Sequence, residues 1–490
     1  MSLRSWAIRG LILAGVAALA VLGWIASSWV SPERVRAQVI AHLSEQFEGA
    51  DVHVGAAHMR IFGGIAVSDI RLTLRGAESP FFTVGSGILY PDKEQVNRGR
   101  LVIKKVELEH PELHLDRDKD GRWNIEEVLR ATPPDKPVPT FVIRGATVHI
   151  TDRGPDPLPP ITLSKADVTL LNDPLPILAV QVKGQTNSYG PLNARARLNR
   201  VTGGLSIGLE MTEFPLGEVA VKAADRFAPE LADHVSGLAA NAFVTADLTY
   251  TPDAPRKWRH DIRLDLRDAK FTHPDLPCAI ENITASARVV DGRVKLDNAT
   301  AIVNGTKATL TLETRTGAPP DPQPRSGKEA TRKGELDDAA LRKLEHHLQH
   351  AEISIGNVAL DDALFKHLPE KAKTARRRFS PVGKVDLGYK FTRDPTGWKR
   401  EFEVRPKQIA ATYEKFRYPV ADLRGWIKRT DTPAGPPSVD VDLIGTADGQ
   451  PITIKGNLIG DGDDPGINIR VTGTNIPMND KLVAAFPPKY

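Results

Sequence analysis

Apolar and polar residues alternate along most of this 490-residue chain. The alternation begins at Val52 and Val54, which flank His53, and it returns at short intervals up to Val471. Successive side chains of a β-strand point to opposite faces of the sheet, so the pattern predicts strands with one apolar and one polar face. Helical patterns between these stretches are few, and the links are short. We therefore predict a mostly β fold with few short helices and antiparallel connections between its strands.

One helix is expected before the first strand. Ser31 suits the cap position and Pro32 the first helical position. Apolar residues then recur every fourth position, at Val35, Val39, Leu43 and Phe47. This spacing places them on one helical face. We predict a helix that ends at Gly49 and packs this face on the following sheet; the alternative is that the face rests on a membrane surface.

The first 30 residues contain a long uncharged segment. Leu11–Trp29 carries no charged residue, and its nineteen residues would span about 28 Å as a helix, close to the hydrocarbon thickness of a bilayer. Arg4 and Arg9 precede it, which favours a cytoplasmic N-terminus. We predict a transmembrane anchor within residues 1–30 and export of the remainder. The alternative is a cleavable signal peptide, for which the small residues at 26–28 give a cleavage site.

Composition excludes several classes of function. The net charge is only +4, and Lys and Arg are interleaved with Asp and Glu, so no basic footprint for nucleic acid is present. The single cysteine, Cys278, excludes an internal disulfide and a thiolate metal cluster. Its apolar neighbours favour a small buried residue over a nucleophile. The 38 prolines and 39 glycines suit many short strands joined by turns.

Two breaks in composition divide the exported part. Residues 131–139 are rich in proline, and residues 317–337 are rich in Pro, Gly and charge, which predicts disorder for the second stretch. We expect an α+β cap domain followed by three sheet segments, the second of which contains the disordered excursion. The predicted bounds are 31–135 for the cap and 136–217, 218–358 and 359–490 for the sheet segments.

The three sheet segments share an internal plan. A hairpin is followed each time by a short stretch with an apolar face, which starts near Leu216, Leu360 and Met478. Units that repeat in this way extend one sheet by stacking. The last unit ends at Tyr490, where the earlier units continue into a strand, so it is expected to be incomplete.

Catalytic motifs are weak. Residues 204–208 satisfy G-x-S-x-G, but Leu205, Ile207 and Leu209 continue a strand there, whereas a nucleophile elbow needs a strand, a sharp turn and a helix. The chain has no P-loop, dinucleotide fingerprint or H-E-x-x-H motif. We therefore expect neither an enzyme nor a bound cofactor.

Two stretches are weak candidates for metal binding. Asp116, Asp118, Asp120 and Glu127 have the spacing of a calcium loop, in which carboxylates converge on a hard cation. A strand precedes them instead of a helix, so we prefer a polar turn at Asp120–Gly121, with Asn124 capping a short helix. A second candidate combines Glu345 with His346, His347 and His350. A solvated polar helix is the preferred interpretation there, and no metal is expected at either place.

Several stretches together resemble the AsmA family of bacterial envelope proteins. They follow the predicted anchor and helix, and the match is best up to about residue 170. The stretches are ADVHVG at 50–55, VSDI at 67–70, VELEHPELHL at 106–115, DGRWNI at 120–125 and FVIRGATVHITD at 141–152.

The resemblance implies an elongated sheet curled into an apolar groove, and a part in phospholipid movement between the inner and outer membranes. It implies an inner-membrane anchor with the bulk of the chain in the periplasm, and the inner membrane and phospholipids as partners. The chain is short for a protein that crosses the periplasm alone. The alternative is a structural or adaptor protein that binds other envelope proteins through its sheet. The candidate groove-lining residues are Leu205, Ile207, Leu209, Ile467, Ile469 and Val471.

Overall fold

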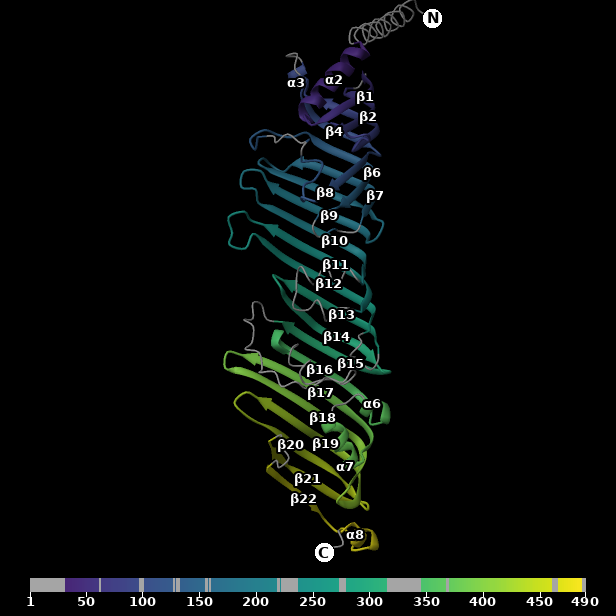
Figure 1. The fold of residues 1–490 in the computed structure, drawn as a ribbon, viewed down its shortest axis with the longest axis vertical. Coiled ribbons are helices and arrows are strands. Elements are labelled where there is room, and N and C mark those ends of the chain that lie inside the picture. The colour runs from purple at the N-terminus through teal and green to yellow at the C-terminus, as the bar shows by residue number, and fades with distance from the viewer. Residues whose placement is uncertain are drawn as a thin grey trace, which may run out of the picture. The chain divides into compact units, whose positions relative to one another are not determined.

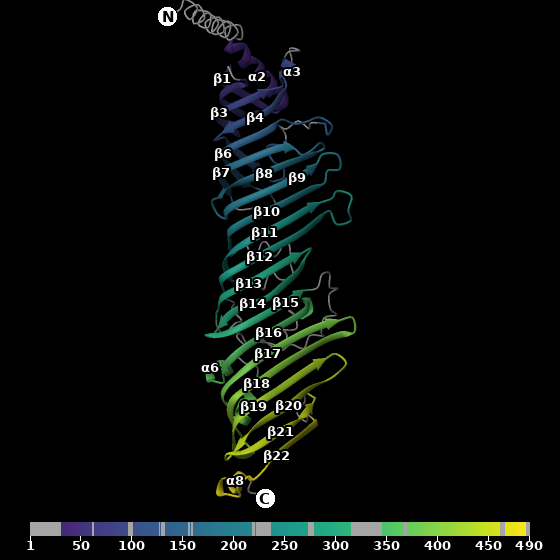
Figure 2. The same ribbon diagram turned by 180° about the vertical axis from the view of Figure 1, so that it is seen from behind.

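The chain folds mainly as β-structure. The computed structural model describes residues 31–60, 63–96, 101–126, 128, 133–154, 157, 160–217, 221, 237–272, 279–314, 345–366, 370–460 and 466–486. These residues form one 22-stranded sheet with a few short helices (Figures 1 and 2). The predicted mostly β, largely antiparallel fold is confirmed.

The chain divides into two compact units. Unit 1 comprises Met1–Phe214 and Thr245–Arg259, and unit 2 comprises Pro215–Val244 and His260–Tyr490. The predicted division into a cap and three sheet segments remains a prediction.

The described part of unit 1 begins with a helix that covers the first strands. Helix α2 (Pro32–Gln46) is capped by Ser31, whose hydroxyl accepts a hydrogen bond from the Arg34 amide at 3.4 Å. Its residues Val35 and Val39 are buried in one core with side chains of the first strands. The predicted packing on the sheet is therefore confirmed, although the helix ends at Gln46, earlier than expected. The strands below it are β1 (Ala50–Met59), β2 (Ile65–Leu74), β3 (Phe82–Pro91), β4 (Ile103–Glu109) and β5 (Glu112–Arg117), with helix α3 (Lys93–Val96) after β3.

The next strand pairs in parallel, which the sequence did not predict. Strand β6 (Thr140–Asp152) runs parallel to both β4 and β5, which follow one another along it. His110, with φ 51°, separates β4 from β5. A parallel pair needs a long connection, and residues 118–139 separate β5 from β6 in the sequence, which is long enough.

The remaining strands of unit 1 form an antiparallel meander. Each pairs with its predecessor in sequence from β6 to β10. The strands are β7 (Ile161–Asn172), β8 (Ile177–Thr186), β9 (Gly190–Asn199) and β10 (Leu205–Leu216), and β11 (Leu238–Tyr250) is divided between the two units.

Unit 2 continues the same plan. Every successive pair from β12 to β22 is antiparallel. The strands are β12 (Trp258–Phe271), β13 (Ile280–Val290), β14 (Arg293–Val303), β15 (Thr306–Thr314), β16 (Leu348–Ala359), β17 (Val382–Asp394), β18 (Gly397–Tyr413), β19 (Phe416–Thr432), β20 (Gly435–Ala447), β21 (Gln450–Ile459) and β22 (Gly466–Gly473).

Short helices follow two of the hairpins, at the places where the repeat predicts a short stretch with an apolar face. Helices α6 (Asp362–Lys366) and α7 (Glu370–Phe379) come after the β15–β16 hairpin, and α8 (Asp480–Ala485) comes after β21–β22 (Figure 1). Most of the corresponding stretch after β10 lies outside the described residues.

Bulges recur along the strands. The register shifts where one residue adopts a left-handed conformation. These residues are Lys165, Asp268, Asn282, Asn298, Asn357, Gln408 and Asp422. Asn and Asp tolerate this conformation better than most residues, and a bulge bends its strand. The side chain after the bulge is often buried, as at Ala166 and Ala269, which are both 0% exposed.

Three sequence predictions fall outside the described residues. They are the anchor at 1–30, the disordered excursion at 317–337 and the burial of Cys278. Within the described part of the chain, every helix is too short or too polar to cross a membrane.

Candidate functional site

Strands β7–β10 of unit 1 align their apolar side chains in rows. Val180 of β8 lies opposite Ala196 of β9, which lies opposite Ile207 of β10. Directly opposed residues share one face of a sheet, so each row crosses several strands on the same side. Two neighbouring rows are Leu178–Leu198–Leu205 and Val182–Ala194–Leu209.

These rows are only half-buried. Each of their members retains partial exposure, in contrast to the fully covered residues below α2. The main helix contacts of the described residues join α2 to β1, α7 to β18 and α8 to β19. The rows on β8–β10 thus present an apolar face that lacks a major helical cover among the described elements, whereas Leu163 and Ala166 of β7 and Met211 of β10 are buried.

Unit 2 has a longer row of the same kind. It crosses the consecutive strands β15–β22 through directly opposed residues. Its members are Ala308, Ile355, Leu387, Val404, Ile427, Val441, Gly456 and Ile469. Apart from the buried Ala308 and from Gly456, which has no side chain, its members are half-buried or exposed. The half-buried members Leu387, Val404, Ile427 and Val441 pack at their edge against a buried cluster of Val385, Ile409, Leu423 and Leu443. We call this row and the rows on β8–β10 the apolar faces of unit 2 and unit 1.

The opposite faces carry charge pairs. In unit 2, Lys428 Nζ lies 2.8 Å from Glu401 Oε1, and Lys455 Nζ lies 3.1 Å from Asp442 Oδ2. The Glu401 carboxylate raises the pKa of Lys428 because it accepts a hydrogen bond from the ammonium group. In unit 1, Arg197 lies 3.4 Å from Asp173. Such pairs suit a face that meets water, so the two sides of each sheet differ sharply in chemistry.

A buried charge cluster covers one part of the unit 2 face. Arg400, 5% exposed, binds Glu345 at 2.7 Å and approaches Asp431 at 3.6 Å. The hydroxyl of Tyr389 donates to Glu345, and burial together with this carboxylate raises the pKa of Tyr389 far above its usual range. Glu345 belongs to the helical turn that precedes β16. The apolar face is therefore covered here. It is buried again at Val385 of β17 and Ile409 of β18, and between these two places Leu387 and Val404 are half-buried.

A shallow hollow over β16–β19 is too heavily charged to suit an apolar ligand. Its lining includes Glu352, Lys390, Glu401, Arg405 and Lys428, beside the apolar Ile353, Ile355 and Leu387. Charged walls of this kind bind polar groups or water. The candidate for an apolar ligand is the open face itself, not this hollow.

The six predicted groove residues lie on these faces. Leu205, Ile207 and Leu209 are half-buried on β10 within the unit 1 rows. The other three lie on β22, where they are 64%, 41% and 62% exposed for Ile467, Ile469 and Val471. Ile469 closes the long row, and Val471 lies opposite Ile454 of β21. Their role as lipid contacts remains a prediction.

The predicted calcium-type stretch contains a polar turn. Asp118 accepts a hydrogen bond from the Arg122 amide at 2.9 Å, and Gly121 has φ 85°. Asn124 bonds back to β5, through the Asp116 amide and the His114 carbonyl, and does not act as a helix cap there. Among the described residues, Asp116, Asp118 and Asp120 do not gather as a group of metal ligands. Glu127 lies outside the described residues.

Two further motifs are placed by the structure. Ser206 of the G-x-S-x-G motif lies within β10, opposite Arg197, so the strand, turn and helix of an elbow are missing at this position. Glu345 binds Arg400 and Tyr389, and it does not join its histidine neighbours in a metal-ligand group among the described residues.

Sequence reasoning missed most of the unit 2 face. Leu387, Val404 and Ile427 each belong to an alternating pattern, but only the register shows that they meet in one row. Phe402 and Tyr389, which also oppose each other, add aromatic surface beside it. The signal in the sequence was the equal spacing of apolar residues in successive hairpins.

Comparisons with known proteins identify no family for this chain. No protein-family model matches it, and no curated protein matches its sequence.

Proposed function

We propose that the protein binds the acyl chains of phospholipids along its apolar faces. The observation that carries this proposal is the row from Ala308 to Ile469, which keeps one apolar side in register across successive strands while charge pairs occupy the other side. An acyl chain needs a continuous apolar surface and no specific hydrogen bonds. Contiguous apolar surface that remains open to solvent is typical of a binding site.

The energetics suit a reversible carrier of apolar chains. Each methylene group moved from water to an apolar surface gains about 0.8 kcal/mol when fully buried. A half-open face buries only part of each methylene, so many weak contacts add up without holding any one position tightly. We infer binding that is strong for a whole chain and permissive for movement along the face.

We further propose that the protein acts in the bacterial envelope, as its resemblance to the AsmA family implies. An anchor at residues 1–30 would hold one end at the inner membrane, and the sheet would lie in the periplasm. The bends made by the bulges would curl the apolar side into a groove. In this proposal the protein takes part in outer-membrane biogenesis as a lipid-binding protein and not as an enzyme.

Lipid analysis of purified protein tests the proposal. The full chain is extracted in mild detergent, and its co-purifying lipids are measured by mass spectrometry. We expect phospholipid in the wild type and a clear loss in the Ile207→Asp/Ile469→Asp double variant. The matched control is Ser206→Asp/Asn468→Asp, which adds the same two negative charges at neighbouring residues of the opposite face.

The control should retain lipid at the wild-type level. Equal lipid in all three proteins would mean that the apolar faces are not the binding site. Absence of phospholipid from folded wild-type protein would favour the alternative, an envelope adaptor that binds proteins through its sheet.

A further inference from the structure

A group of potential metal ligands lies on the polar side of the first parallel strands. Glu112 and His114 are two residues apart on β5, so their side chains share one face. His149 of β6 lies directly opposite His114 in the parallel register. Leu113 and Val148 oppose each other on the other side. The parallel pairing of β5 with β6 therefore brings the three residues together.

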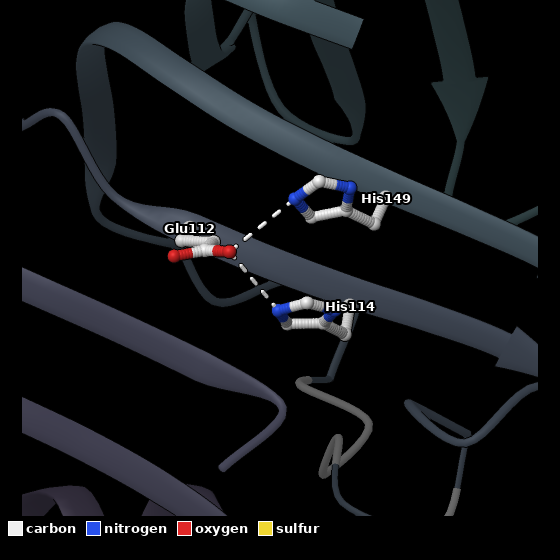
Figure 3. Close-up of side chains that lie close together, drawn as sticks. All are labelled: Glu112, His114 and His149. Carbon is white, nitrogen blue, oxygen red and sulfur yellow. Dashed lines mark ion pairs between the residues drawn. The ribbon is translucent and has the colours of Figure 1, made fainter. Parts of the chain in front are cut away.

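Both histidines approach the same oxygen of the Glu112 carboxylate. Glu112 Oε1 lies 3.3 Å from His114 Nε2 and 3.3 Å from His149 Nε2. The two imidazole rings are stacked, with centroids 4.7 Å apart and planes 17° apart. Figure 3 shows that each ring presents a nitrogen to the same carboxylate oxygen. This is the one such His, Cys and carboxylate group found among the described residues.

The oxygen–nitrogen distances match those between two ligand atoms of one metal ion. Zinc binds imidazole nitrogen at about 2.0–2.1 Å and carboxylate oxygen at about 2.0–2.2 Å, usually with tetrahedral geometry. Two such ligands are then about 3.3–3.5 Å apart. The two oxygen–nitrogen distances in the structure already have this length. The two rings are stacked nearly parallel, so the imidazole side chains must rotate to aim both lone pairs at a shared ion.

A hydroxyl on the neighbouring strand favours the metal-binding tautomer of His149, which carries its proton on Nδ1. His149 Nδ1 lies 3.3 Å from the hydroxyl of Thr162 on β7, the residue opposite it in the antiparallel register. When Nδ1 donates its proton to this hydroxyl, Nε2 keeps the lone pair that a metal requires. Hydrogen bonds of this kind orient metal-binding histidines in many proteins.

We propose that Glu112, His114 and His149 bind a divalent transition ion of the Zn²⁺ class. Two imidazoles and one carboxylate favour such an ion over Ca²⁺ or Mg²⁺, which prefer oxygen ligands. The side chains remain 50%, 43% and 35% exposed, so the fourth coordination position is open to water. The bound ion would fasten the short strand β5 to β6 and so stabilise the parallel pairing. The site does not involve the apolar faces, so it stands or falls independently of lipid binding.

Calorimetric titration of the full, metal-stripped chain with ZnCl₂ tests this site. We expect one ion per chain, and a loss of affinity of about 100-fold or more in His149→Asn. Thr162→Val keeps all three ligands, and its affinity for zinc should fall about 10-fold, the lower end of the range for a supporting hydrogen bond. The matched control is His53→Asn, because His53 lies 3.5 Å from Asp69 as a similarly exposed pair of one histidine and one carboxylate.

The control should bind zinc as the wild type does. A second readout is the melting temperature, which zinc should raise in the wild type and in His53→Asn but not in His149→Asn. The graded loss in Thr162→Val tests the site even if His149→Asn fails to fold. The proposal is overturned if the wild type binds no zinc, if His149→Asn binds as tightly as the wild type, or if His53→Asn weakens binding equally.

Discussion

Two regions of unit 1 use the same alternating pattern with opposite outcomes. In the first strands, Val54 and Ala57 are 0% and 1% exposed because α2 closes one side of the sheet. On β8–β10, the apolar residues of the rows, such as Val180, Ala196 and Ile207, remain half-exposed, although their strands alternate just as regularly. The comparison teaches that alternation creates an apolar face but does not decide what covers it. A covered face becomes a core, and an open face becomes available to a ligand.

The largest expected difference between the two regions comes from a buried charge. Val54→Asp places an unpaired carboxylate in the closed core, which costs several kcal/mol and should unfold the first part of unit 1. Ile207→Asp leaves its carboxylate in contact with water, so stability should change by about 1 kcal/mol or less. Urea denaturation followed by circular dichroism measures both. Equal destabilisation would mean that the unit 1 face is a closed core with no room for a ligand.

The charge cluster extends the comparison to unit 2. Arg400→Met leaves Glu345 buried without its main ion-pair partner, and we expect a loss of about 3–5 kcal/mol. Arg195→Met serves as the control, because Arg195 is 78% exposed and 3.9 Å from Asp247, and it should have no measurable effect. The Arg400→Met/Glu345→Leu double variant should recover most of the loss. If Arg400→Met is as mild as Arg195→Met, this part of the face is open and not covered.

A pair of smaller truncations sharpens the comparison without introducing charge. Ile65 is 3% exposed below α2, so its replacement by alanine should lower the free energy of unfolding by about 2–5 kcal/mol. Ile207→Ala removes the same atoms from a half-exposed position, so it should lower the free energy of unfolding by only about 1 kcal/mol. Added phospholipid should leave the stability difference between the wild type and Ile65→Ala unchanged. It should stabilise the wild type more than Ile207→Ala. Denaturation midpoints with and without lipid provide the measurement.

The smallest expected effect concerns pH and the helical cover. Burial lowers the pKa of His42 on α2 below its usual value of 6.5, with a partial opposing effect from Glu45. As pH falls through 6.5, the unfolded chain takes up a proton that the folded chain resists, so stability decreases until the lower folded pKa is passed. His42→Gln should weaken this decrease. Thermal melting at about pH 8 and about pH 5.5 compares the two proteins; an unchanged pH dependence in the variant would show that His42 does not contribute.

Much of the fold could be predicted from local sequence signals. The Ser31 cap and the apolar face through Val35 and Val39 predicted α2 and its packing, because both depend on neighbouring residues. The alternation at Leu205 and Ile207 predicted one face of β10 for the same reason. Local patterns of this kind are set by the geometry of one helix or one strand.

Features that depend on pairing were not predictable. The parallel pairing of β6 arises from a long return connection, and no local signal in β6 distinguishes a parallel from an antiparallel neighbour. The alternating Glu112 and His114 were visible in the sequence, but His149 joins them only through that register. The bulge residues, such as Asp268 and Asn357, look like ordinary polar positions until the register shift is seen. Long-range register is therefore the information that a single sequence did not supply.

Site-specific photo-crosslinking tests the central claim most directly. A photoreactive amino acid is placed at position 207 or 469 on the apolar faces, or at the adjacent position 206 or 470 on the opposite faces, and crosslinked lipid is measured in cells. Our account predicts phospholipid adducts at 207 and 469 and none at 206 and 470. Adducts at all four positions, or at none of them, would contradict the claim that the open apolar faces bind lipid.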